Sequence, residues 1–403
     1  MIVLGLSGAL QHDPSAALVI DGETIAAAEE ERFVRDKHAK KQRPLESAKF
    51  CIEYAGIDPK DIDYVAFPFA PISIFSPARW HYAKRYWYAP DRALDALLNG
   101  NRKYRAHRKG IIELGESLGI DWQKTEFVPV EHHLSHASSA YHLSGFNQKC
   151  AVLGVDGKGE YATTFFGYGE GGDPTKFDLS SLIERVGGDI KVDTEKVNTV
   201  GLRRHKDDGQ AFFFSSKLID WLGPRRMDDA ADEPYVHYAA SMQDLFETRV
   251  LELVDTHLSD VLAESGKIVF AGGGALNVKL NQRLLARPDI EELFVQPASG
   301  DSGTALGAAT YVAHNKGDSI APMAHVYLGP SYDNDQCEQA IKSAGDEVTA
   351  IKMADPVAET ADILAAGNPV AWFHGRMEFG PRALGARSIL GCPNARGPNS
   401  IRP

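Results

Sequence analysis

The sequence predicts a mixed α/β fold with two similar halves, followed by the beginning of a further α/β unit. An apolar run leading into a polar glycine turn occurs at residues 2–8 and returns at residues 150–157, and a second apolar run follows each of them. Helical and β patterns alternate along the rest of the chain, which is typical of α/β proteins. The repeated strand–turn–strand pattern indicates two halves that face each other across a cleft.

The composition excludes several classes of protein. The 403 residues suffice for two or three domains, and 43% hydrophobic with 24% charged residues is ordinary for a soluble globular protein. A net charge of −12 without a long basic tract argues against a nucleic-acid surface. No run approaches the roughly 18 apolar residues of a membrane helix. The four cysteines form no C-x-x-C pair, which fits a reducing cytoplasm.

The first half is expected to begin with three strands joined by a polar loop and a hairpin. The strands are predicted at residues 2–7, 16–20 and 24–28, and Asp21-Gly22 is a strong hairpin turn. A helix over 44–55 ends at Gly56, and a strand follows at 64–69. Residues 76–120 are aromatic and basic, and we interpret them as a helical insertion, either a lid or a packed subdomain.

The second half is expected to repeat this beginning and then to alternate strands with helices. Strands are predicted at 150–155, 161–168, 267–270 and 292–295, and helices at 242–263, 275–285 and 304–314. Residues 315–326 have the composition of a linker. Beyond them, helices at 337–343 and 358–366 and a strand at 369–373 begin another α/β unit that looks incomplete.

The pentad from His132 to His136 is the most informative motif. On a helix, residues four apart share one face, so His132 and His136 are spaced to hold one metal ion. Asp156 ends an apolar strand, and Asp301 lies in a Gly-Asp-Ser-Gly turn before a helix. Two imidazoles and two carboxylates would suit iron, manganese or zinc. The alternatives are a polar His-rich turn, an Asx turn at Asp156 and a helix cap at Asp301.

Three further features indicate a ligand site. Gly272-Gly273-Gly274 stands between a strand and a helix and suits a phosphate or nucleotide, although tight packing explains it equally well. His12, in the first loop, is a general-base candidate that faces the same cleft as Asp156, although a lone histidine is more often structural. The segment 375–390 interleaves glycines with three arginines suited to phosphate or carboxylate groups: Arg376, Arg382 and Arg387.

These motifs, taken in order, resemble those of the O-carbamoyltransferases of the nodulation-factor, tobramycin and cephem antibiotic type. The resemblance rests on L-G-L-S-G, H-D-P-S-A-A-L, A-A-A-E-E-E-R-F, E-H-H-L-S-H-A-S-S-A-Y, V-D-G-K-G-E, A-G-G-G-A-L-N, F-V-Q-P-A-S-G-D-S-G-T-A-L-G-A-A and G-R-M-E-F-G-P-R-A-L-G-A-R-S-I-L. It covers nearly the whole chain, and the ordered set is far more specific than any single motif.

The resemblance implies a duplicated actin-like, sugar-kinase-like domain over residues 1–320, with halves of about 1–147 and 148–320. It also implies that residues 326–403 are an incomplete, apparently truncated YrdC-like domain. In the family, such a domain makes carbamoyl-adenylate from carbamoyl phosphate and ATP, with Mg²⁺ on the nucleotide. The larger domain then passes the carbamoyl group to a hydroxyl of a small molecule beside an iron ion.

Carried onto this sequence, the resemblance implies specific roles for matching residues. Iron would be bound by His132, His136, Asp156 and Asp301. His12 would be the base or would orient the acceptor, and Lys37 would be a site residue. The nucleotide would meet the glycines at 272–274 and Asn277. A cytoplasmic enzyme, with a homodimer left open, is the corresponding expectation.

Two other functions remain open at this point. A sugar-kinase-like phosphotransferase would need phosphate loops and a catalytic aspartate but no histidine pair. A catalytically impaired nucleotide-binding protein of the same fold is the other, because residues 225–234 lack a lysine-containing stretch usual in the family. The acceptor molecule is not encoded in any motif.

Overall fold

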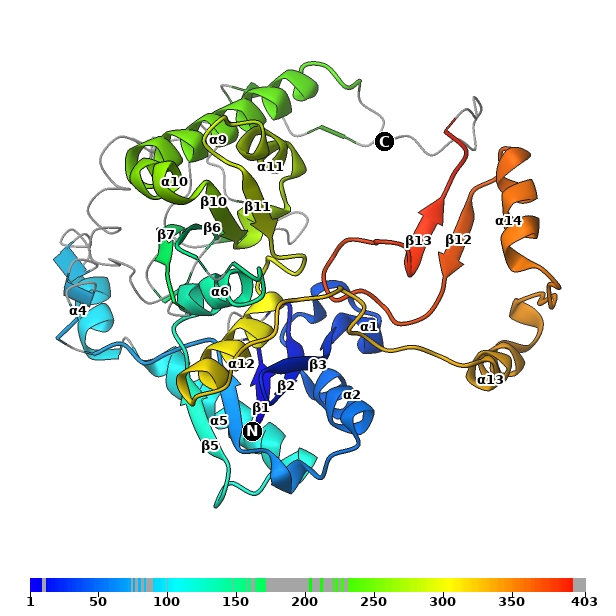
Figure 1. Cartoon of the computed structure of the whole chain (residues 1–403), viewed down its shortest axis with the longest axis horizontal. Coiled ribbons are helices and arrows are strands. Elements are labelled where there is room, and N and C mark those ends of the chain that lie inside the picture. Colours follow the sequence, from blue (N-terminus) through cyan, green and yellow to red (C-terminus); the bar gives the residue numbers. More distant parts are fainter. Residues whose placement is uncertain are drawn as a thin grey trace.

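The computed structural model describes residues 1–8, 12–73, 90–99, 101–146, 148–157, 159–160, 164–171 and 231–393, with a few short stretches between 75 and 84 and between 203 and 227. Within them the chain is a mixed α/β protein, as predicted. Figure 1 shows two sheets with two helices packed side by side between them, and a smaller unit to one side.

The first sheet has five strands in the order β3-β2-β1-β4-β5. These are β1 (Ile2–Leu6), β2 (Ser15–Ile20), β3 (Glu23–Glu29), β4 (Tyr64–Phe67) and β5 (Glu126–Pro129). β1 and β2 run antiparallel, as do β2 and β3, while β1, β4 and β5 are parallel. The turn between β2 and β3 has positive φ at both Asp21 and Gly22, which confirms the predicted hairpin.

The second sheet repeats the order and directions of four of these strands. β6 (Cys150–Val155) and β7 (Thr164–Gly169) are antiparallel, while β10 (Lys267–Ala271) and β11 (Glu292–Val295) run parallel to β6 in the order β11-β10-β6-β7. β7 is described from Thr164, and the first residues of the strand predicted at 161–168 lie outside the described residues. The shared topology is the structural counterpart of the repeated sequence pattern. The domain division at residues 147 and 320 stays a prediction.

Helices cover both faces of the first sheet. The described elements of this half before α6 (His132–Tyr141) also include α1 (Glu31–Val34), α2 (Leu45–Ala55), α4 (Pro90–Asn99), α5 (Arg102–Leu118) and the 3-10 turns η1 (Lys37–Ala39) and η2 (Pro59–Asp61). Ile52 of α2 and Leu114 of α5 pack in one buried cluster with Leu4 and Leu18 of the sheet. Within the 76–120 insertion, α5 is therefore packed on the sheet, whereas Leu94 and Leu98 of α4 are exposed.

The two halves exchange helices at the centre of the molecule. α6 (His132–Tyr141) follows β5 but packs against β6 and β10, whereas α12 (Gly303–Asn315) follows β11 but packs against β1 and β2. α6 and α12 also contact each other along their length, as Figure 1 shows. Every residue of α12 from Gly303 to Thr310 is buried, because small side chains leave room for neighbours on both sides.

Two helices of the second half differ from the prediction. The helix expected at 242–263 is two helices, α9 (Tyr235–His257) and α10 (Ser259–Ser265), which meet at the buried Leu258. The helix expected at 275–285 begins as a 3-10 turn, η3 (Gly273–Leu276), and only then becomes α11 (Val278–Leu285). Asn277 separates them because its extended backbone caps α11.

The segment 315–326, which was predicted to be a linker, is hydrogen-bonded to the main body. Ala321 donates its N–H to the carbonyl of Gly22, and Met323 donates to Leu143, each at 3.0 Å. Beyond it, Leu328 and Phe379 are buried in the core that contains α12. These contacts fix the segment because its backbone hydrogen bonds are made to the main body.

The last unit contains α13 (Asn334–Ala344), η4 (Gly345–Glu347), α14 (Pro356–Ala365) and an antiparallel pair, β12 (Val370–Phe373) and β13 (Arg387–Leu390). Strand β13 was not predicted. Two two-residue strands, β8 (Arg203–Arg204) and β9 (Ala211–Phe212), form a separate pair. The altered stretch at 225–234 lies partly outside the described residues.

Candidate functional site

The histidine pair lies on the first turns of α6, as the spacing predicted. Glu131 caps this helix, and its carboxylate accepts the N–H of Leu134 at 2.6 Å. His132 and His136 are almost completely buried, with ring centroids 4.8 Å apart and planes perpendicular. The helix thus places two ring nitrogens beside each other in the interior.

The two aspartates converge on these nitrogens from different elements. Asp156 follows β6, and Asp301 lies just before α12, so both are at positions where α/β proteins place ligand-binding groups. Nε2 of His132 lies 3.3 Å from a carboxylate oxygen of Asp156 and 3.7 Å from one of Asp301. Nε2 of His136 lies 3.9 Å and 3.7 Å from the same two oxygens. We call these four residues the four-ligand cluster.

The cluster fits a metal ion. Donors bound tetrahedrally about 2.1 Å from one ion lie about 3.4 Å from each other, close to the separations seen here. Nε2 of His136 is buried and has no hydrogen-bond partner, which is costly unless a further group occupies the centre. Although burial works to raise the pKa of Asp156, the hydrogen bond to His132 and the nearby His136 hold it well below its usual range. Metal binding at these residues, and the identity of the metal, stay predictions.

A second group of titratable residues surrounds the cluster, and the sequence did not predict it. Nδ1 of His133 lies 3.3 Å from Glu131, and Glu160 accepts the N–H groups of Ala70 and His132. Burial, together with the charge of Glu131, raises the pKa of Glu160 well above its usual value. Burial works to raise the pKa of Glu131 too, but the hydrogen bond and charge of His133 and the N–H of Leu134 together outweigh it and lower the pKa to about 2. Glu160 therefore favours its protonated form and Glu131 its ionised form.

His12 lies at the edge of the cluster. Its Nε2 is 3.7 Å from one carboxylate oxygen of Asp301, while the other oxygen of Asp301 faces the two cluster histidines. Its Nδ1 lies 2.9 Å from Asp13. The hydrogen bond with Asp13 raises the pKa of His12, and burial opposes this. Residues 9–11, which precede it, lie outside the described residues.

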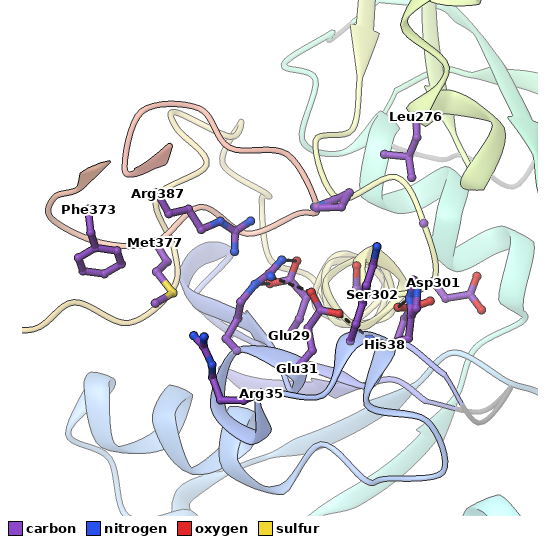
Figure 2. A pocket seen from close by; sticks show the side chains of 15 residues that line it. Glu29, Glu31, Arg35, His38, Leu276, Asp301, Ser302, Phe373, Met377 and Arg387 are labelled. Carbon is purple, nitrogen blue, oxygen red and sulfur yellow. Dashed lines mark hydrogen bonds and ion pairs between the residues drawn. The ribbon is translucent and has the colours of Figure 1, made fainter. Parts of the chain in front are cut away.

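A pocket of about 620 Å³ opens beside Asp301. Figure 2 shows that its walls come from the first half, from the loop before α12 and from the segment around β12 and β13. Lys37 and Arg35 line it, and in the described part of the chain no ion pair involves either side chain. Arg32, in contrast, is paired with Glu29 and Glu31. Two of the cations that line the pocket therefore make no ion pair among the described residues, although carboxylates line it as well.

The glycine run has a packing role that the structure makes visible. A Cβ on Gly272 would lie 2.4 Å from the carbonyl oxygen of Val155, and one on Gly274 would lie 2.8 Å from the Val155 side chain. The N–H of Gly273 donates to Asp156 at 3.2 Å. Asn277 caps α11 through Leu280 and exchanges two side-chain hydrogen bonds with Gln243. Binding of a nucleotide by these residues stays a prediction.

The three arginines of the 375–390 segment have different partners. Arg376 donates to the carbonyls of Ile25, Leu328 and Gly329 and lies 4.0 Å from the ring centroid of Tyr54. It does not line the 620 Å³ pocket. Arg382 donates to the carbonyl of Leu276 at 3.0 Å.

Of the three, Arg387 is the one that lines this pocket. In Figure 2 its guanidinium group extends toward the glutamates of the first half. It is also bonded to Gly380 and to Glu378. Protein oxygens therefore lie beside each of the three guanidinium groups. Binding of an anionic ligand by these arginines stays a prediction.

Comparison with family models matches residues 2–190 and 199–310 to Carbamoyltransferase N-terminus, and residues 361–401 to Carbamoyltransferase C-terminus. The chain is 35% identical to the uncharacterized protein sll1178 of Synechocystis, over 97% of this chain and 71% of that protein. It is 32% identical to nodulation protein NolNO of Sinorhizobium fredii, over 98% of this chain and 62% of that protein. The chain thus spans less than two thirds of the length of NolNO.

Solved structures with a similar fold match this chain with low TM-scores and low sequence identity. A ROK hexokinase from Thermus thermophilus matches 77% of this chain and 99% of its own with a TM-score of 0.36 and 15% identity. Full-length HypF in a phosphate- and nucleotide-bound form matches 79% of this chain and 56% of its own with a TM-score of 0.30 and 11% identity. Among the helices that the structure describes, none is both long and apolar enough to cross a membrane.

Proposed function

Because the chain belongs to the carbamoyltransferase family, we propose that it transfers a carbamoyl group to a hydroxyl of a small molecule where the four-ligand cluster meets the 620 Å³ pocket. The observation that carries this proposal is the position of Asp301. One of its carboxylate oxygens faces the buried histidines, the other faces His12, and the residue also lines the pocket. A ligand in this pocket can thus lie next to both a metal and a base.

The proposed donor is carbamoyl-adenylate, formed from carbamoyl phosphate and ATP with Mg²⁺. In the transfer step, the acceptor oxygen forms a bond to the carbamoyl carbon, and the bond from that carbon to the phosphate oxygen breaks. The electron pair leaves with AMP, and the hydroxyl proton passes to Nε2 of His12. Formation of the adenylate is assigned to the YrdC-like unit, of which residues 326–403 would be part.

His132, His136, Asp156 and Asp301 would hold the ion, with iron as the proposed metal. Such an ion supplies Lewis acidity toward the carbamoyl oxygen. The side chains of Lys37 and Arg35 suit the negative charge that the phosphate carries as it leaves, because protein carboxylates do not neutralise them. The cluster also favours this reaction over sugar-kinase chemistry, which needs no histidine pair.

The test uses synthetic carbamoyl-adenylate, a panel of polyhydroxylated small molecules, and AMP release as the readout. Wild-type protein loaded with Fe²⁺ should release AMP faster when an acceptor is present than with water alone. His12→Gln should lower kcat by about 10²–10⁴-fold, as expected for loss of a general base. His237→Gln is the matched control, because His237 is an exposed histidine on α9. Absence of acceptor-dependent AMP release from metal-loaded protein, across the panel, would exclude the proposed reaction.

A further inference from the structure

We propose that Asp13 is a positioning residue that holds the imidazoles of His12 and His38 together, and that His38 is a second acceptor-binding group of the pocket. The role in transfer rests on the function proposed above, but the geometric part does not. Nothing in the family resemblance or the comparisons assigns a role to Asp13 or His38. They were also not singled out by the sequence patterns, because they are 25 residues apart.

The carboxylate of Asp13 uses each of its oxygens for a different ring. One oxygen lies 2.9 Å from Nδ1 of His12, and the other lies 2.8 Å from Nδ1 of His38. Both Asp13 and His38 line the pocket, and His12 reaches toward Asp301. A continuous row of polar groups thus runs from His38 through Asp13 and His12 to Asp301.

The backbone fixes this row in place. Asp13 donates its N–H to the carbonyl of His38 at 2.9 Å, so the two segments are paired by main chain as well as by side chain. The carbonyl of Asp13 accepts a hydrogen bond from the buried Ser7. Ser15 donates to the carbonyl of Ser302 at 2.5 Å, next to Asp301. The loop that bears His12 is therefore anchored both to β1 and to the turn that bears a cluster ligand.

Backbone strain accumulates in the same place. Asp13 has φ 49° and His38 has φ 66°, and Arg35, Ala39 and Lys41 also have positive φ. Residues other than glycine adopt this region at an energetic cost that the surrounding structure must offset. The two residues with the hydrogen-bonded side chains, Asp13 and His38, are thus both held in this backbone region.

The tautomer of the two imidazoles decides which ring nitrogen can accept a proton from a ligand. A carboxylate only accepts hydrogen bonds, so each neutral imidazole must carry its proton on Nδ1 when it binds Asp13. Nε2 is then the nitrogen that is free to accept a hydroxyl proton or hydrogen bond. The single carboxylate of Asp13 thus leaves Nε2 of both His12 and His38 able to accept a proton.

A cation site formed by Asp13, Glu31 and His38 is the competing interpretation, since their donor atoms lie within 4.8 Å of one another. The contacts disfavour it. Nδ1 of His38 is taken by Asp13, and Glu31 accepts the N–H of His38 at 2.7 Å and pairs with Arg32. The three groups are satisfied by each other and by Arg32.

The first experiment is nitrogen-15 NMR of labelled histidine side chains at a pH at which the imidazoles are neutral. His12→Asn and His38→Asn assign the two rings by loss of signal, and asparagine tolerates positive φ at position 38. In wild-type protein both rings should carry the proton on Nδ1. In Asp13→Asn, one amide oxygen replaces two carboxylate oxygens and the amide nitrogen is a donor, so at least one ring should change tautomer. A wild-type proton on Nε2 of either ring overturns the proposal.

The second experiment measures transfer from carbamoyl-adenylate. Asp13→Asn should lower kcat by about 10²-fold or more, with metal content unchanged, because a wrongly protonated ring cannot accept the proton. His38→Asn should raise the acceptor KM more than it lowers kcat. Asp36→Asn is the control, since Asp36 lies in the same loop and its side chain makes a 3.4 Å hydrogen bond with Gln42 rather than with His12 or His38.

The outcomes separate the two proposals. A kcat of Asp13→Asn within about twofold of wild type overturns the role of Asp13 in transfer. If wild-type protein transfers to no acceptor, the proposed function fails, and the NMR result still decides whether Asp13 holds the two rings. A loss of metal together with loss of kcat in Asp13→Asn would show a merely structural role and would also overturn the proposal.

Discussion

Substitution of Gly307 by alanine should test whether the contact between α6 and α12 sets the geometry of the four-ligand cluster. Gly307 is buried in α12, and a Cβ added there would lie 1.8 Å from the carbonyl oxygen of Ser135 and 2.9 Å from Cβ of Ser139, both on α6. Ser135 lies between the two cluster histidines in sequence. Asp301 lies two residues before α12. The substitution therefore affects both α6, which bears the two histidines of the cluster, and α12, which Asp301 precedes.

The size of the effect follows from the distances. Because Cβ contacts below 3.0 Å are not tolerated, the two helices must separate by about 1.2 Å at this point. Metal–ligand distances tolerate only about 0.2 Å, so separation should weaken metal binding by about tenfold or more. Overpacking costs about 1–3 kcal/mol, and the helix preference of alanine offsets about 1 kcal/mol of it. Because the clash is with backbone, we expect an overpacking cost near the top of its range, about 3 kcal/mol, and therefore a net loss of about 2 kcal/mol.

The assay combines urea unfolding with titration of Fe²⁺ into metal-free protein. Gly110→Ala is the control, since Gly110 is also in a helix but the atoms nearest to its added Cβ belong to the flexible guanidinium end of Arg43, at 3.1 Å. That variant should keep its metal affinity and lose no more than a few tenths of a kcal/mol. Wild-type metal affinity and stability in Gly307→Ala would refute the conclusion that the α6–α12 contact positions the ligands.

Three further predictions concern the cluster and the last unit of the chain. Plasma emission should find one transition metal ion per chain in purified protein, and His136→Ala should bind none. The variant should also lose the stabilisation that the ion gives, about 2.7 kcal/mol when the metal concentration is a hundredfold above Kd. Equal metal content in the two proteins would show that the predicted metal site does not exist. Arg376→Ala should destabilise the protein by about 2–4 kcal/mol in urea unfolding, because carbonyl oxygens lose a charged donor and Tyr54 loses its cation. Arg376→Lys should recover less than half of that, and full recovery would argue that only the charge matters. Burial works to raise the pKa of Glu378, but hydrogen bonds from the N–H groups of Leu384 and Ala386 outweigh burial and lower this pKa. Because the pKa is lower in the folded state, the Glu378 carboxylate stabilises the fold fully at neutral pH, and this stabilisation is lost below about pH 4. The stability difference between wild type and Glu378→Gln should shrink on acidification in matched unfolding curves, and a constant difference from pH 7 to 3 would contradict this assignment.

Local sequence was sufficient where one short segment decides the structure. Asp21-Gly22 predicted a hairpin because a two-residue turn needs positive φ at both positions, and these residues accept it. The spacing of His132 and His136 predicted one helical face because the period of the helix is fixed. The break at Asn277 was missed because a cap and a helical residue differ in backbone angles, not in hydropathy.

The arginines illustrate what the same reasoning could not decide. Arg376, Arg382 and Arg387 have equal charge and similar neighbours in sequence, and the pattern assigned all of them to an anionic ligand. In the folded chain Arg376 binds the carbonyl of Ile25, 351 residues away in sequence, and stacks on Tyr54, while Arg387 reaches the pocket. Which oxygen a guanidinium group meets depends on segments that only folding brings together.

By itself the sequence determined the chemical inventory and the local elements: the donor types of the four-ligand cluster, the strands and helices that bear them, and the repeated pattern behind two sheets of one topology. Only the tertiary structure decided how these parts meet. It placed α6 on the second sheet and α12 on the first, joined Asp13 to His38, and made Asp301 common to the cluster and the pocket. The physical reason is that periodicity and turn chemistry act over a few residues, whereas ligand geometry depends on packing between segments that are distant in the chain.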